Sequence, residues 1–109
     1  MPTTGQQLFT TLDPDGTLTV ALEEATTSDP TGTQVLVKME AAAINPSDLA
    51  ILVGAADIDT AEFTPGKFVA IVPEPYNALS KARHGLKLPA GNEGAGTVIA
   101  AGDDPTAQA

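Results

Sequence analysis

The stretch VLVKMEAAAINPSDLAILVG, from Val35 to Gly54, decides how this chain folds. Its first half alternates apolar and polar residues, and this period of two predicts a β-strand over residues 34–44. The apolar side chains of the strand share one face: Val35, Val37, Met39 and Ala41. Lys38 and Glu40 point to the other face, because successive side chains of a strand alternate.

The second half of this stretch predicts a short helix. Asn45 can cap the helix, Pro46 suits its first position, and Asp48 can accept hydrogen bonds from the first-turn amides. We therefore expect a helix that continues through residues 49–53 and stops at Gly54.

A second informative stretch, PAGNEGAGTVIAAG, runs from residue 89 to residue 102. It predicts a strand over residues 97–101 after a cluster of glycines. Gly91, Gly94 and Gly96 have the spacing G-x-x-G-x-G and precede a strand, whereas a dinucleotide-binding fingerprint is G-x-G-x-x-G and opens a helix. We therefore assign these glycines to turns and close backbone packing.

The rest of the chain predicts a mainly β protein with short helices. Leu18, Val20 and Leu22 alternate with Thr and Ala, which indicates a half-buried strand. Residues 55–66 show no clear period. The other expected elements are a loose lead-in over 1–7, strands over 8–12, 17–22 and 67–72, a hairpin turn over 13–16, a loop over 26–33, and one or two helical turns within 77–85.

Composition excludes several classes of function. The chain has 109 residues and a net charge of −9, from 14 acidic and 5 basic side chains, so it offers no basic surface for nucleic acid. It has no apolar run of about 18 residues and no secretory signal, so we expect no membrane insertion and a cytoplasmic location. It has no Cys, which excludes disulfides and thiolate chemistry.

The two stretches at residues 35–54 and 89–102 together resemble the amino-terminal, GroES-like part of the medium-chain dehydrogenase/reductase superfamily. The resemblance implies a partial GroES-like β-barrel. It also implies a hydride transfer from NADPH or NADH, with the dinucleotide held by a Rossmann domain. We therefore expect residues 1–109 to be a single incomplete catalytic domain whose Rossmann domain is absent from this chain. The segment 55–88 is longer than in common members of the superfamily.

The zinc-dependent relatives place a Cys ligand at the position of Asn45 and a His ligand at that of Asn92. Asn is a poor zinc ligand, and a catalytic zinc needs about three ligands from Cys, His and carboxylate. Glu93 alone could still coordinate, and His84, the only histidine, lies in the unassigned segment. The resemblance therefore points to the zinc-independent quinone oxidoreductase and enoyl reductase branch.

The resemblance also suggests roles for individual residues. Asn45 and Asp48 would lie near the nicotinamide and the substrate mouth as catalytic residues, with Asn45 also binding the cofactor. Ser47 occupies the proton-relay position of the zinc-dependent relatives, although no zinc alkoxide would need that relay here. Tyr76 and Asn92 are the candidate substrate-binding residues.

Each of these residues also has a structural explanation. Asn45, Ser47 and Asp48 are ordinary residues for the first turn of a helix. Tyr76 would more often pack in a core. Glu93 would more often bond nearby backbone, and the basic residues at positions 81, 83 and 84 would form a solvated face.

The resulting expectation is the amino-terminal catalytic part of an oxidoreductase that reduces a quinone or an activated alkene, inactive by itself. The alternative is a non-enzymatic GroES-like module, or a truncated remnant, that acts only through protein–protein contacts. We also expect homo-oligomers or self-association through unpaired strand edges, either at Val98 and Ile99 or along residues 35–41. A chaperonin-10-like co-chaperone is disfavoured, because no strand pattern supports it.

We predict that the purified, folded chain carries no stoichiometric zinc, because Asn replaces the expected ligands at positions 45 and 92. Elemental analysis after dialysis against a zinc-containing buffer checks this. One tightly bound zinc per chain would contradict the assignment to the zinc-independent branch.

Overall fold

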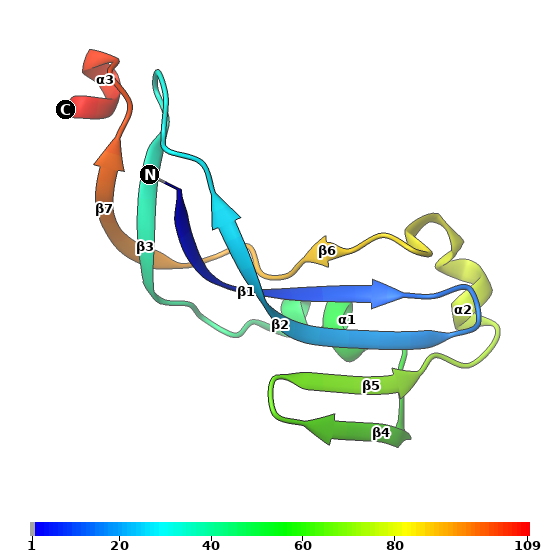
Figure 1. The fold of residues 1–109 in the computed structure, drawn as a ribbon. Coiled ribbons are helices and arrows are strands. Elements are labelled where there is room, and N and C mark those ends of the chain that lie inside the picture. Colours follow the sequence, from blue (N-terminus) through cyan, green and yellow to red (C-terminus); the bar gives the residue numbers. More distant parts are fainter. Residues whose placement is uncertain (1) are drawn as a thin grey trace. The chain divides into compact units, whose positions relative to one another are not determined.

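The computed structural model describes residues 2–109 and confirms a mainly β protein with short helices (Figure 1). Its sheets are open and do not close into a barrel. The strands are β1 (Thr3–Leu12), β2 (Thr17–Thr27), β3 (Val35–Ala41), β4 (Asp57–Thr64), β5 (Lys67–Ile71), β6 (Leu88–Pro89) and β7 (Ala95–Ala101). The helices are α1 (Pro46–Val53), α2 (Tyr76–Leu79), the 3₁₀ helix η1 (Lys81–Arg83) and α3 (Pro105–Gln108). No helix among these residues is long and apolar enough to cross a membrane.

The chain divides into two compact units. The first unit holds residues up to 5, then 25–43 and 92–109, and contains β3, β7 and α3. The second unit holds residues 6–24 and 44–91, and contains the other helices together with β4, β5 and β6. The long strands β1 and β2 have residues in both units.

The second unit is built on a five-stranded sheet with the order β4-β5-β2-β1-β6. The predicted turn between β1 and β2 is confirmed: the Gly16 N–H donates to the Asp13 carbonyl at 2.9 Å, and Gly16 has a φ of 92°. That positive φ is one that glycine adopts without strain. Asp15 Oδ1 accepts from the Thr17 backbone N–H at 2.9 Å, and this bond lowers the pKa of the Asp15 carboxyl.

The core of the second unit is small. Leu12, Leu18 and Val72 form its buried centre, and Phe68 packs partly buried against them. Of the face predicted for β2, Leu18 is buried and Val20 is half-buried, whereas Leu22 is 46% exposed. Few apolar contacts therefore support this unit, and hydrogen bonds to buried polar groups gain importance.

Residues 57–64, for which we predicted no element, form the edge strand β4. The connection to β5 is the two-residue turn Pro65-Gly66, in which Gly66 has a φ of 73°. Phe63 and Phe68 lie opposite each other beyond the turn, with ring centroids 5.0 Å apart in an edge-to-face arrangement. Phe63 is nevertheless 74% exposed, so the pairing of β4 with β5 does not bury an apolar face of β4. Apolar and polar residues accordingly do not alternate in the sequence of β4.

The prediction of a loose lead-in over residues 1–7 is wrong for the described part, because β1 begins at Thr3; Met1 lies outside the described residues. The expected loop at 26–33 also begins later, because β2 extends to Thr27. Hydroxyl contacts join these polar strand ends: the Oγ1 atoms of Thr4 and Thr26 are 3.2 Å apart, and Thr27 Oγ1 donates to the Thr3 carbonyl. These hydroxyl contacts between β1 and β2 do not depend on an alternation of apolar and polar residues.

The first unit contains the two-stranded antiparallel sheet of β3 and β7. The register pairs Leu36 with Ala100 and Lys38 with Thr97. The two strands approach closely at Gly96, where any Cβ would collide with the Lys38 carbonyl oxygen. The glycine at this position is therefore needed for strand packing, as the sequence predicted.

Asn77 is a buried polar residue that joins three segments of the second unit. Its Nδ2 donates to the Pro14 carbonyl at 3.0 Å and to Glu74 Oε1 at 3.2 Å. His84 Nε2 lies 2.9 Å from Asn77 Oδ1 and 3.1 Å from the Asn77 carbonyl oxygen. Both of these partners are acceptors, so Nε2 of His84 carries the proton.

The expectation of a solvated basic face is therefore wrong for two of its three residues. His84 is half-buried against Asn77, and Arg83 is half-buried and donates to the buried Thr10 hydroxyl at 3.0 Å. Lys81 alone is exposed. Arg83 is held by Thr10, which is distant in the sequence, and His84 is held by Asn77, whose own burial depends on the distant Pro14 carbonyl.

We predict that Asn77→Ala lowers the free energy of unfolding by roughly 1–3 kcal/mol, because it leaves the Pro14 carbonyl without its side-chain donor and removes one of the two acceptors near His84 Nε2. Urea unfolding followed by circular dichroism measures the loss. The control is Gln7→Ala, an exposed amide in the same unit, which should change stability by less than about 0.5 kcal/mol. Equal effects of the two substitutions would show that Asn77 does not join these segments.

Candidate functional site

The predicted helix start at Asn45 is confirmed. Asn45 has extended backbone angles, with φ −102° and ψ 155°, and serves as the N-cap of α1, with Pro46 in the first turn. The helix ends at Gly54, whose N–H donates to the Ala50 carbonyl at 3.3 Å. The local sequence therefore sets both ends of α1.

Asp48 works in this cap. Its side chain is only 8% exposed, and its Oδ2 accepts from the Asn45 N–H at 2.8 Å, which is the reciprocal half of a capping box. Its negative charge also lies in the first turn, where the helix dipole favours an anion. Asp48 therefore holds the backbone of Asn45 in place.

The other side chains of this turn face outward. Ser47 is exposed and Asn45 is half-buried, so a small molecule could reach both polar groups. Two exposed apolar residues flank them: Ile44 is 82% exposed and Leu49 is 49% exposed. The first turn of α1 thus offers hydrogen-bonding groups between two apolar side chains. We refer to the segment Ile44–Leu49 as the α1 turn.

The two predicted substrate-binding residues lie elsewhere in the chain. Tyr76 begins α2 in the same unit as the α1 turn and is 53% exposed, so its alternative interpretation as a core residue is wrong. Asn92 is exposed and belongs to the other unit. The structure therefore brings together Asn45, Ser47 and Asp48 on one turn, and it does not join Tyr76 or Asn92 to them by any hydrogen bond shown for residues 2–109.

Neither the glycine cluster before β7 nor the start of α1 fits the phosphates of a dinucleotide. At Gly94 an added Cβ would collide with the Met39 side chain, and at Gly96 with the Lys38 carbonyl, so both glycines pack against β3. At the N-terminus of α1, where backbone amides could hold a phosphate, the Asp48 carboxylate already accepts a hydrogen bond. Among residues 2–109, no three His, Cys, Asp or Glu side chains gather as metal ligands.

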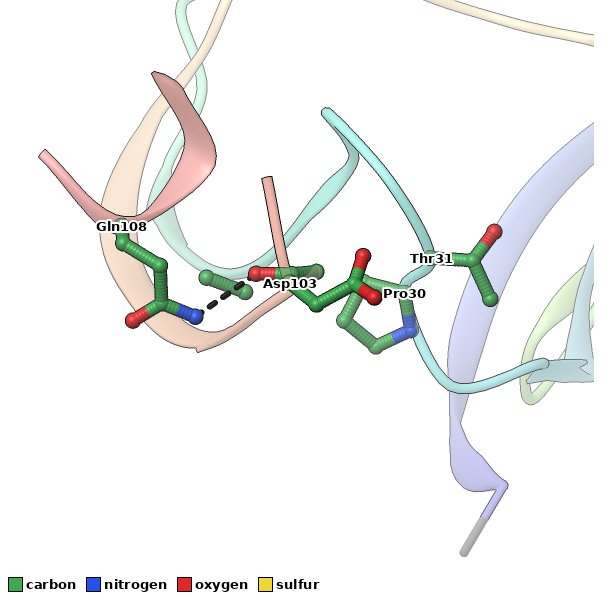
Figure 2. Close-up of a pocket in the computed structure, with 6 residues that line it drawn as sticks. Pro30, Thr31, Asp103 and Gln108 are labelled. Atoms are coloured by element: carbon green, nitrogen blue, oxygen red, sulfur yellow. Dashed lines mark hydrogen bonds between the residues drawn. The ribbon is translucent and has the colours of Figure 1, made fainter. Parts of the chain in front are cut away.

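A pocket of about 370 Å³ lies in the first unit, near the end of β7 (Figure 2). Its lining residues are Pro30, Thr31, Ala101, Gly102, Asp103 and Gln108. Gln108 Nε2 donates to the Gly102 carbonyl at 2.6 Å, so one polar group of the lining already has a partner (Figure 2). The carboxylate of Asp103 is exposed, and the other residues that line this pocket are neither acids nor bases. The pocket therefore lacks a catalytic pair.

Sequence reasoning missed the helix that borders this pocket. Asp104 and Pro105 are the N-cap and first residue of α3, and Asp104 Oδ1 accepts from the Thr106 N–H at 2.8 Å. The signal was present, because Asp followed by Pro is the same pattern of cap and first residue that predicted α1.

Neither the comparison with protein-family models nor the search of curated proteins gives a match to this chain. The resemblance of residues 35–54 and 89–102 to the medium-chain dehydrogenase/reductase superfamily therefore stays an inference from those residues.

We predict that Asp48→Ala lowers the free energy of unfolding by about 1–2 kcal/mol, because the Asn45 N–H loses its side-chain acceptor. Asp48→Asn keeps an acceptor oxygen at the same place and should cost less. Thermal unfolding of both variants measures the difference. If both variants unfold at the same temperature as the wild-type protein, the cap does not hold the α1 turn.

Proposed function

We propose that this chain is the acceptor-binding part of a zinc-independent, NAD(P)H-dependent oxidoreductase that reduces a quinone or an activated alkene. The observation that carries the proposal is the α1 turn, in which Asn45 and the exposed Ser47 lie between the exposed side chains of Ile44 and Leu49. A quinone or enone combines a flat apolar body with a carbonyl oxygen. The turn supplies apolar contact for the body and hydrogen-bond donors for the oxygen.

The arrangement of the two resembling stretches supports the proposal. They are separated by 34 residues in the sequence, yet their strands, β3 and β7, are hydrogen-bonded neighbours. The first of them leads directly into α1, so the strand-to-helix order that carried the resemblance is also the order of the fold.

In the proposed reaction this chain binds and orients the acceptor. The Asn45 amide and the Ser47 hydroxyl would donate hydrogen bonds to the acceptor carbonyl, on which negative charge develops as it is reduced. Asp48 is a positioning residue, because it fixes the backbone from which Asn45 projects. The polar groups of the turn thus begin from a set geometry rather than a flexible loop.

The cofactor of the proposed enzyme is NADPH or NADH, as the resemblance implies. Since neither the glycine cluster nor the start of α1 fits its phosphates, we assign phosphate binding to a Rossmann domain outside these residues and assign no reaction step to this chain through the cofactor. The chain by itself is then expected to bind the acceptor without turning it over.

A second candidate function is a non-enzymatic module that acts by protein–protein contact. The observation that favours it is the exposure of apolar residues on the β3–β7 sheet, where Val37 is 38%, Val98 is 53% and Met39 is 58% exposed. Binding of a small acceptor at the α1 turn distinguishes the two candidates, because the module has no need of it.

We predict that two probes perturb the backbone amide NMR signals of the α1 turn in the isolated chain. The enone probe is cyclohex-2-enone, and the quinone probe is tetramethyl-1,4-benzoquinone. Asn45→Ala should weaken binding roughly 2–10-fold, which corresponds to the loss of one hydrogen bond. Ser28→Ala, an exposed hydroxyl in the other unit, is the matched control and should leave the affinity unchanged. Perturbations confined to other segments, or none at millimolar probe, would contradict the proposal.

A further inference from the structure

The strand β3 has one edge without a partner strand. Its sheet has only two strands, and no backbone hydrogen bond shown for residues 2–109 joins β3 to a strand other than β7. The Gln34 carbonyl accepts from the Gly102 N–H at 2.8 Å, and the Lys38 carbonyl lies against Gly96, so both point toward β7.

The direction of these two carbonyls fixes the direction of the others. Along a strand, the N–H and C=O of one residue point to the same side, and those of the next residue point to the opposite side. Val35, Val37 and Met39 alternate with Leu36 and Lys38 and therefore direct their N–H and C=O away from β7. Three consecutive odd-numbered residues thus offer donors and acceptors for a further strand.

The side chains of the same three residues are also uncovered. Val35 is 43%, Val37 is 38% and Met39 is 58% exposed. The segment contains no Pro, and bulges and prolines are common devices that stop an edge from pairing with another chain. The register shift of β3 lies between Met39 and Ala41, beyond the three outward-facing residues.

The charges of β3 favour a second copy of the chain as its partner. Lys38 and Glu40 make residues 35–41 neutral, although the whole chain carries −9. Two copies of this segment therefore approach without local repulsion. Repulsion between the remaining charges is screened over about 8 Å at physiological salt.

We propose that a second copy of this chain pairs with the free edge of β3, antiparallel to it, about a two-fold axis at Val37. Val37 then lies opposite the Val37 of the other copy, and Val35 opposite its Met39. All three outward-facing residues of each copy exchange backbone hydrogen bonds, and the cross-strand side-chain pairs are apolar. The pairing is independent of the proposed reaction, since it uses no residue of the α1 turn.

The charges also select this register. With the axis at Val37, Lys38 faces the uncharged Leu36 of the other copy, so no like charges meet across the regular part of the pairing. An axis at Lys38 would place two lysines opposite each other, which is destabilising. The edge of β7 is a poorer partner, because a register shift opposite Leu36 and Val37 interrupts that strand at its centre.

Proline at position 37 tests the pairing selectively. The Val37 N–H points away from β7, so Val37→Pro removes a donor of the free edge and leaves the β3–β7 hydrogen bonds in place. Val37→Thr, which keeps the N–H and the β-branched shape, is the matched control. Sedimentation from about 10 to about 500 μM should show a concentration-dependent dimer for the wild type and Val37→Thr, and a monomer for Val37→Pro with an unchanged circular dichroism spectrum.

A chain that is monomeric throughout this range, or a dimer that persists in a folded Val37→Pro variant, would overturn the proposal; the latter would mean that the copies meet through apolar faces. If Val37→Pro does not fold, Met39→Lys decides, because it adds a charge to the edge without altering the backbone and should also give a monomer.

Single cysteines test the register, because the chain has no native Cys. In the proposed dimer the two residues 37 lie about 5.5 Å apart, within the range of a disulfide, whereas the two residues 39 lie roughly 14 Å apart. Val37→Cys should therefore form a disulfide-linked dimer under mild oxidation, and Met39→Cys should not. Faster cross-linking at position 39 than at 37 would overturn the proposed two-fold axis.

Discussion

The close approach of β3 and β7 is the constraint on which both proposals depend. It requires a residue without a side chain at Gly96, where an added Cβ would collide with the Lys38 carbonyl oxygen. The approach joins the two stretches that carry the family resemblance. It also orients the backbone of β3, so that one edge is satisfied by β7 and the other faces outward.

At the α1 turn, structural and functional explanations apply to different atoms. Asp48 is buried and its carboxylate accepts from the Asn45 N–H, so capping accounts for its presence. The same explanation does not account for the exposed Ser47, or for the exposed Ile44 and Leu49 beside it. An exposed polar group between exposed apolar side chains is a feature that a ligand can use and that stability does not require. The functional proposal therefore depends on these outward-facing groups.

Local chemistry in the sequence predicted much of the fold. The turn before Thr17, the cap at Asn45 and the alternation of β3 each follow from a few adjacent residues. β4 was missed because its residues are mostly exposed, although the Pro65-Gly66 turn between Phe63 and Phe68 was a usable hairpin signal. Of the candidate site, the sequence predicted the cap and the cluster of polar residues on one turn.

The burial of Asn77 and the half-burial of Arg83 could not be predicted, because their partners Pro14 and Thr10 lie far away in the sequence. The exposure of the apolar face of β3 could not be predicted either. A period of two shows which side chains share a face, but it does not show whether another layer covers that face.

Amide hydrogen exchange along β3, measured by NMR in dilute solution, tests the central claim most directly. If β7 pairs with one edge of β3 and the other edge is open, the amides of Leu36 and Lys38 are protected, whereas those of Val35, Val37 and Met39 exchange rapidly. Uniform protection along the strand, or protection of the odd-numbered amides in the dilute monomer, would contradict the account.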